Sequence, residues 1–98
     1  MNLYVIRRPY GWANAEELGV AAQRSRRVGD DEMSDDIRWI RSYVVLEDDG
    51  TLGTFCIYEG TSIDKVREHA DRADLPVTSV HEVVDTVIVR PDPVPANR

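Results

Sequence analysis

The sequence predicts an α+β domain in which the elements follow the order β-α-β-β-α-β and the sheet is antiparallel. Three observations lead to this prediction. Four segments are rich in β-branched and aromatic residues, as strands are. Two other segments begin with helix-capping patterns and continue with apolar residues at helical spacing. Finally, Asp49-Gly50 lies between the two middle β-rich segments and is typical of a tight hairpin.

The first strand is expected from Leu3 to Arg8, a short run of residues that favour extended backbone. Pro9 and Gly11 follow it, and both residue types commonly interrupt regular structure. The strand is therefore predicted to end at Arg8.

The first helix is expected to begin after Asn14. Asn14 can accept hydrogen bonds from first-turn amides, and Glu17 can reach back, as in a capping box. Small and apolar residues then recur at helical spacing: Leu18, Ala21, Ala22, Ser25 and Val28. Gly29 either ends the helix or lies within it, so helix or a short turn is expected up to Asp35.

The central hairpin is expected to join a strand over residues 37–46 to a strand over residues 52–59. Asp49-Gly50 would form a two-residue turn, since both positions of such a turn need positive φ. The predicted cross-strand pairs are Val45 with Thr54, Tyr43 with Cys56, and Arg41 with Tyr58.

This pairing divides the hairpin into two faces. One face is predicted to carry Trp39, Arg41, Tyr43 and Tyr58. The other is predicted to lie beneath the helices and to carry Ile40, Val44, Leu46, Phe55 and Ile57. An open face with three aromatic side chains is too apolar to remain in water, so we expect an interface or a ligand site there. Two such faces packed together would form a dimeric α+β barrel with a cavity between them.

The second helix is expected to follow the capping box Thr61-Ser62-Ile63-Asp64 and to end before Pro76. The last strand is expected from Ser79 to Arg90. Three prolines follow it and cannot enter a central sheet, so residues 91–98 are predicted to form a loose extended tail. The domain would then comprise residues 1–90. With right-handed crossovers, this order is the split βαβ, or ferredoxin-like, arrangement.

Composition narrows the class of protein. The chain has 98 residues, which is the size of one domain, and 42% of them are hydrophobic. A domain this small buries a modest share of its surface, so a homodimer is expected. The net charge of −6 makes nucleic acid and anionic membranes unlikely partners. A single cysteine, Cys56, and the lack of a signal-peptide layout at the first residues favour the cytoplasm.

The sequence resembles a family of small bacterial domains of unknown function, some of which are described as nickel-binding proteins of dimeric ferredoxin-like fold. The resemblance lies in residues 37–44, 55–59, 66–70, Leu75-Pro76 and Glu82-Val83. It implies the ferredoxin-like fold and a homodimer.

The resemblance also implies nickel as a cofactor, with His69 and Glu82 as the matching metal ligands. In nickel-binding members the first strand ends in an Asp-x-His pattern, and here the matching positions are Ile6 and Arg8. An alkyl group and a permanent cation replace two donors that nickel would favour.

Three functions remain open on the sequence. The leading one is a non-catalytic module that binds a small, anionic molecule in a dimer cavity on the open face. Its predicted lining is Arg8, Trp39, Arg41, Tyr43, Tyr58 and Glu82. The second is binding of nickel or another transition metal. The third is a cofactor-independent enzyme with His69 or Tyr43 as acid or base. A buried or boundary histidine more commonly forms an ordinary hydrogen bond than binds a metal, and a cysteine in a strand more commonly packs as a small apolar residue than reacts. These structural roles remain the alternative for His69, His81 and Cys56.

Overall fold

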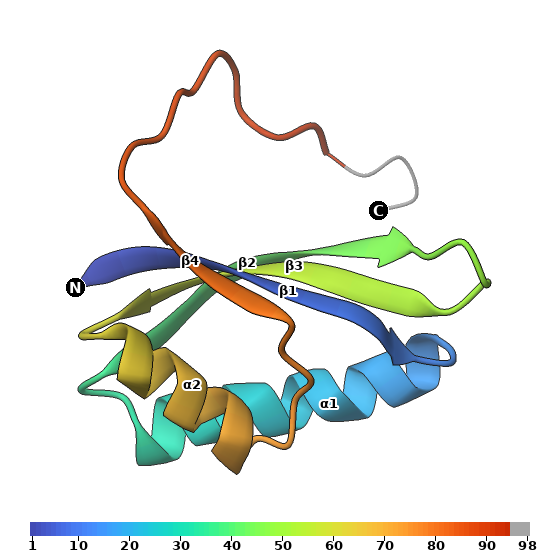
Figure 1. Ribbon diagram of the computed structural model, residues 1–98, viewed down its shortest axis with the longest axis horizontal. Helices are drawn as coiled ribbons and strands as arrows, with labels where there is room; N and C mark the ends of the chain where they lie inside the picture. Colours follow the sequence, from blue (N-terminus) through green and yellow to red (C-terminus); the bar gives the residue numbers. More distant parts are fainter. Residues whose placement is uncertain (95–98) are drawn as a thin grey trace.

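The computed structural model describes residues 1–94 and consists of two layers. Two helices cover one face of an antiparallel sheet whose strand order is β2-β3-β1-β4 (Figure 1). The elements are β1 (Asn2–Trp12), α1 (Ala15–Arg27), a π-helical turn (Val28–Glu32), β2 (Ile37–Leu46), β3 (Leu52–Gly60), α2 (Ile63–Arg72) and β4 (Ser79–Val83). This confirms the predicted α+β ferredoxin-like order. Of the helices in residues 1–94, none is long and apolar enough to cross a membrane.

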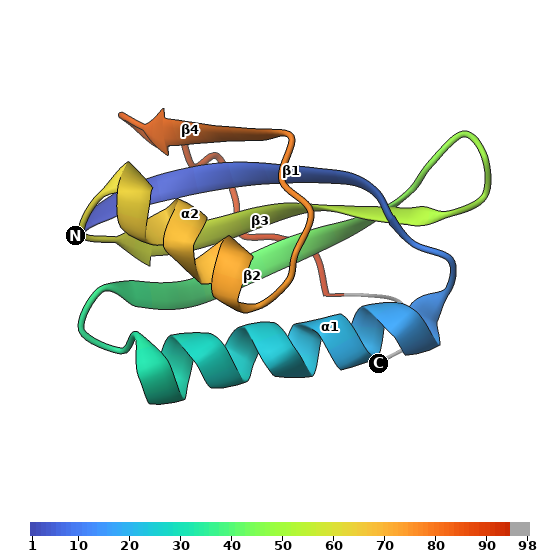
Figure 2. The same ribbon diagram turned by 60° about the horizontal axis from the view of Figure 1, so that its bottom comes forward.

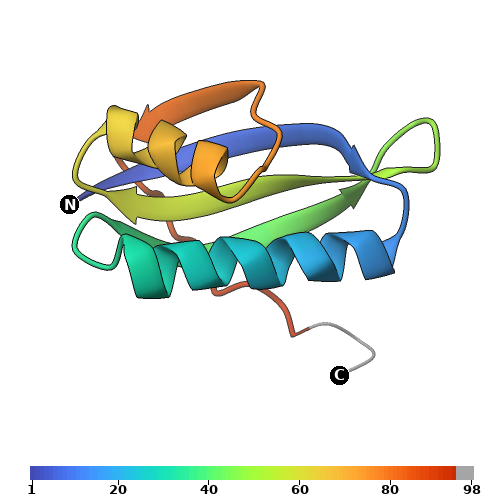
Figure 3. The ribbon, with the colours of Figure 1, turned by 90° about the horizontal axis from the view of Figure 1, so that it is seen from below.

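Helix α1 begins where the sequence predicts. The Asn14 side chain accepts a hydrogen bond from the Glu17 amide at 3.0 Å. The helix does not stop at Gly29 but continues as a π-helical turn, in which the Met33 amide donates to the Val28 carbonyl at 3.0 Å. In both Figures 2 and 3, α1 runs along the β2 edge of the sheet.

Strand β1 is longer than predicted. Pro9 and Gly11 do not end it, and pairing with β3 resumes at Trp12 after an irregular stretch. The irregularity places Tyr10 at a φ of 52°, and its amide donates to Glu47 Oε2 at 2.9 Å instead of to the neighbouring strand. The expected end at Arg8 was wrong because a bulge absorbs the proline without breaking the strand.

The predicted hairpin register is also wrong, by one residue. Tyr43 faces Phe55, where the sequence suggested Cys56. The connection is longer than a two-residue turn: the Gly50 amide donates to the Glu47 carbonyl at 3.1 Å, and Gly50 itself adopts a φ of 88°. Because side chains alternate along a strand, a shift of one residue exchanges the two faces of β3.

A bulge in β2 changes the register of the hairpin a second time. Trp39 pairs with Tyr58, but Arg41 pairs with Ile57, so the register changes at Ile40. Trp39 therefore faces the helices while Ile40 and Arg41 both face away. Residues predicted beneath the helices lie instead on the open face: Ile40, Phe55 and Ile57.

The buried core lies between the sheet and the helices. It contains Tyr4, Ile6, Val28, Met33, Ile37, Cys56, Tyr58, Val66, Ala73 and Val80. Helix α2 packs into it after a Ser62 cap, whose hydroxyl accepts from the Lys65 amide at 3.2 Å. Both Tyr58 and Cys56, predicted on the open face, belong to this core.

The last strand is shorter than predicted. Strand β4 ends at Val83, and residues 84–94 leave the sheet and cross above its open face (Figure 1). The predicted tail begins within this segment, at Pro91. Its last part, residues 95–98, lies outside the described residues.

Candidate functional site

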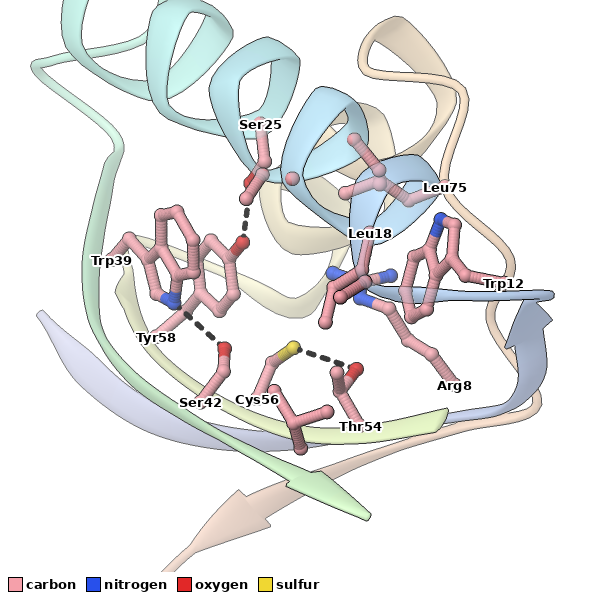
Figure 4. Close-up of a pocket in the computed structure, with 15 residues that line it drawn as sticks. Arg8, Trp12, Leu18, Ser25, Trp39, Ser42, Thr54, Cys56, Tyr58 and Leu75 are labelled. Carbon is pink, nitrogen blue, oxygen red and sulfur yellow. Dashed lines mark hydrogen bonds between the residues drawn. The ribbon is translucent and has the colours of Figure 1, made fainter. Parts of the chain in front are cut away.

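A pocket of about 320 Å³ lies between α1 and the helix-facing side of the sheet (Figure 4). Helix α1 contributes mostly small residues to it, and these leave room that larger side chains would fill. The sheet contributes aromatic, hydroxyl and cationic groups. The lining residues are Arg8, Trp12, Ala15, Leu18, Gly19, Ala21, Ala22, Ser25, Trp39, Ser42, Val44, Thr54, Cys56, Tyr58 and Leu75.

The cation in this pocket is Arg8, on β1. Its side chain is 1% exposed, and its Nη1 donates to the Pro76 carbonyl at 2.9 Å. Its Nη2 is buried and has no hydrogen-bond partner among residues 1–94. No carboxylate within residues 1–94 forms an ion pair with Arg8; its guanidinium lies 5.9 Å from the ring centroid of Tyr58. The pocket thus contains a buried positive charge with one free donor.

Several hydroxyl groups of the pocket and the indole of Trp39 form hydrogen bonds with one another. The Ser25 hydroxyl and the Tyr58 hydroxyl are 2.6 Å apart. On β2, Trp39 Nε1 donates to Ser42 Oγ at 2.9 Å. Burial raises the pKa of Tyr58 to about 12, and its hydrogen bond to Ser25 offsets only part of that rise. Tyr58 is therefore a neutral phenol at physiological pH.

His69 lies behind Tyr58 and is completely buried, with the two ring centroids 5.0 Å apart. Its Nε2 is 3.0 Å from the Ser25 carbonyl, which can only accept, so Nε2 carries the proton. Burial lowers the pKa of His69, and the positive charge of Arg8 lowers it further, against the opposing effect of the Ser25 hydrogen bond. His69 is thus neutral near pH 7 and contributes no charge.

The open face carries a separate cluster that holds the C-terminal segment. Arg41 Nη1 and the Tyr43 hydroxyl both contact Asp92 Oδ2, at 2.8 and 2.5 Å. The hydrogen bond from Tyr43 and the charge of Arg41 lower the pKa of Asp92. Between this segment and the strands lies an open groove of about 700 Å³, whose walls include Leu3 and Ile57.

The residues that were predicted to bind one ligand therefore lie at different places on the sheet. Arg8, Trp39 and Tyr58 line the pocket beneath the sheet. Arg41 and Tyr43 lie on the opposite face, because the hairpin register and the bulge at Ile40 separate them from Trp39. Glu82 is exposed on the edge strand β4 and lines neither cavity.

The sequence reasoning missed several lining residues, notably Trp12, Ser42 and Thr54. A signal is present in the small residues along α1, which leave space beside the sheet. Only Ala21 and Ser25 of this helix are buried, whereas Gly19 is exposed at the edge of the pocket.

A transition metal does not fit the donor groups that the structure brings together. Across residues 1–94, no three His, Cys, Asp or Glu side chains lie close enough to hold an ion. His69 donates from Nε2 to the Ser25 carbonyl and its Nδ1 has no partner within residues 1–94, but the charge that acts on the ring is the guanidinium of Arg8, which repels a metal cation. The predicted partner Glu82 is an exposed residue of the edge strand.

Comparison with known proteins identifies one family and one similar structure. Residues 4–83 match the family model described as "SCO4226-like: Nickel responsive protein SCO4226-like". The crystal structure of SCO4226 from Streptomyces coelicolor A3(2) is similar in fold, with a TM-score of 0.68 and 21% sequence identity. That match covers 87% of this chain and 99% of the SCO4226 chain. A search of curated proteins gave no match.

Proposed function

The chain belongs to the SCO4226-like family of nickel-responsive proteins, and we propose that it binds a small organic anion in the pocket between α1 and the sheet. The observation that carries this proposal is the buried, uncompensated charge of Arg8. Arg8 is 1% exposed, and its Nη2 has no partner in the part of the chain that the structure describes.

A buried charge needs a counter-charge. An unpaired ion in a protein interior costs several kcal/mol, even after the surroundings relax. Tyr58 does not offset it, because burial keeps the phenol neutral, and His69 cannot, because an imidazole is either neutral or positive. A carboxylate or similar anion would supply the missing charge and accept from the free Nη2.

The test is a binding measurement by isothermal titration calorimetry with acetate, benzoate, benzenesulfonate and inorganic phosphate as probes. We expect at least one of these anions to bind the wild-type protein and to lose affinity at least tenfold in Arg8→Met. Arg41→Met is the matched control, because Arg41 is exposed on the opposite face. Binding that is lost in Arg41→Met and retained in Arg8→Met would overturn the proposal.

Nickel requires its own measurement, because the family description names a response to this metal. The donor groups described above do not fit an ion, so we expect Ni²⁺ alone to bind weakly and without dependence on His69. Stoichiometric nickel that is lost in His69→Gln, with the fold intact by circular dichroism, would contradict this expectation.

A second copy of the chain is the partner that we propose for the open face. The segment after β4 exposes several aliphatic side chains, including Val84 at 91% and Val87 at 87%. Phe55, Ile40 and Tyr43 are also exposed on this face. A contiguous apolar surface of this kind is typical of an interface, and the small size of the domain favours association.

Analytical ultracentrifugation tests the dimer. We expect the wild-type protein to sediment as a dimer at micromolar concentration, and Val87→Asp to shift it toward the monomer. Val20→Asp is the control, because Val20 is an exposed aliphatic residue of α1, on the other side of the sheet. A wild-type monomer across the whole concentration range would contradict the proposal.

A further inference from the structure

The polar groups of the pocket limit the kind of anion that fits. Each hydroxyl of the lining already has a partner within the protein: Ser25 with Tyr58, Ser42 with Trp39, and Thr54 with Cys56. Among the described residues, Arg8 Nη2 is the buried donor of the lining that has no partner at all. A ligand rich in hydroxyl or amino groups would have to compete with the internal pairs, at a cost of about 1–3 kcal/mol for each buried group left unpaired.

The charge of the pocket favours a single negative charge. Among residues 1–94, Arg8 is the only cation that lines the pocket. The nearby groups Tyr58 and His69 are neutral, as described above. A dianion such as phosphate would bring a second charge into an apolar cavity with nothing to compensate it.

The side chains that line the pocket favour a ligand with a flat, apolar body. Three aromatic residues line the cavity, and Figure 4 shows Trp12 and Trp39 at opposite ends of it. Leu18 and Leu75 add aliphatic surface. Aromatic side chains bind planar rings through stacked and edge-to-face contacts, which a chain of methylenes makes less well.

The pocket also has a direction. Arg8 is 1% exposed and marks the deep end, whereas Gly19 of α1 and Val44 of β2 are exposed at the mouth. At Gly19 an added Cβ would meet nothing within 4 Å. An anion would therefore enter with its charged group first, and its body would extend toward the gap between α1 and β2.

From these observations we infer that the ligand is an aryl or aryl-alkyl monocarboxylate, bound with its carboxylate on Arg8 and its ring between the aromatic walls. This inference rests on the proposed function and narrows it to one chemical class.

The experiment compares benzoate and 3-phenylpropionate with three groups of probes by calorimetry on the full chain: the neutral isostere benzamide, the alkyl acid hexanoate, and the polar anions citrate and inorganic phosphate. We expect the aryl acids to bind at least tenfold more tightly than benzamide, hexanoate and the polar anions. Their affinity should fall at least tenfold in Arg8→Met.

Two variants at the mouth test the direction of binding. Gly19→Leu adds a side chain beside the opening and should weaken 3-phenylpropionate at least fivefold. Val20→Leu adds one methylene on the neighbouring position, which does not line this pocket, and should leave affinity unchanged. Circular dichroism of each variant confirms that the fold is retained.

The outcomes distinguish failure of the ligand class from failure of the anion site itself. If citrate or phosphate binds in an Arg8-dependent way and the aryl acids do not, the ligand class is wrong and the anion site stands. Equal binding of hexanoate and 3-phenylpropionate would overturn the aromatic part of the inference. If no anion binds with dependence on Arg8, both the inference and the proposed function fail.

Discussion

The indole ring of Trp39 stacks on the phenol ring of Tyr58, with the ring centroids 5.9 Å apart and the planes 6° from parallel. This pair joins the edge strand β2 to the core strand β3, where Tyr58 is completely buried. Trp39 is half-buried, so the stack extends from the core to the wall of the pocket. The same two rings are therefore part of the hydrophobic core and of the proposed ligand site.

The hydrogen bond between Ser25 and Tyr58 gives the first stability prediction. Both hydroxyls are buried and lie 2.6 Å apart, so Ser25→Ala or Tyr58→Phe alone leaves the other without this partner. Each single substitution should lower the free energy of unfolding by about 1–3 kcal/mol. The double variant should cost less than the sum of the two, because no unpaired hydroxyl remains. Urea unfolding measures all four proteins, and strictly additive effects would refute the prediction.

His69 should make stability depend on pH. Its pKa in the folded protein lies below the ordinary value of 6.5, so the unfolded chain binds more protons as the pH falls below that value. The free energy of unfolding contributed by this group is therefore present above pH 6.5 and is lost as the pH falls toward the folded pKa. In His69→Gln, whose amide can still donate to the Ser25 carbonyl, this dependence should flatten. Urea unfolding of both proteins between pH 5 and pH 8 tests this. If the free energy of unfolding depends on pH equally in His69→Gln and in the wild type, His69 is not the group responsible.

Two glycines should respond to alanine in opposite ways. At Gly53, a Cβ would overlap the Glu47 carboxylate and lie 2.8 Å from the Arg8 carbonyl oxygen, so Gly53→Ala should destabilise the protein by about 1–3 kcal/mol. At Gly19, an exposed position in α1, a Cβ meets nothing within 4 Å. Gly19→Ala should stabilise the protein by about 0.5–1 kcal/mol, since alanine favours helix. Thermal melts of the two variants give the comparison, and a melting temperature that changes in the same direction for both would be inconsistent with it.

The contact of Asp92 with Arg41 and Tyr43 should protect the segment after β4 from proteolysis. Asp92→Ala removes both hydrogen bonds, so thermolysin should cleave more quickly near Val87 and Ile88. Asp85→Ala is the control, because within residues 1–94 that side chain accepts a hydrogen bond only from the adjacent Thr86 amide. Mass spectrometry of a digestion time course gives the rates. Equal rates in the two variants would show that Asp92 does not hold the segment.

Most of the fold could be predicted from short stretches of the sequence. Asn14 and Ser62 cap their helices as their sequence context predicts, and the two middle strands have the predicted bounds almost to the residue. The element order followed from these signals. The caps are hydrogen bonds within a few residues of the chain, and the strands lie in local runs of β-branched and aromatic residues, which is why the sequence alone was sufficient.

The two faces of the sheet did not follow from local chemistry. The turn after Glu47 and the bulge at Ile40 each shift the register, and each shift reverses which side chains face the helices. No residue near Ile40 has a sequence signal that predicts a bulge. Arg8, Trp39 and Tyr58 line one pocket on the helix-facing side of the sheet, whereas the sequence placed them on the open face together with Arg41 and Tyr43.

The sequence by itself determined the elements, their order and the caps that begin the helices, because interactions between near neighbours in the chain specify them. Only the tertiary structure decided that Arg8 is buried without a counter-charge and that a pocket remains beside the small residues of α1. Both depend on how α1 and the Leu75 segment pack against one face of β1 and β3. Burial and unpaired charge are properties of that packing, which a one-residue change of register would alter at every position of the strand.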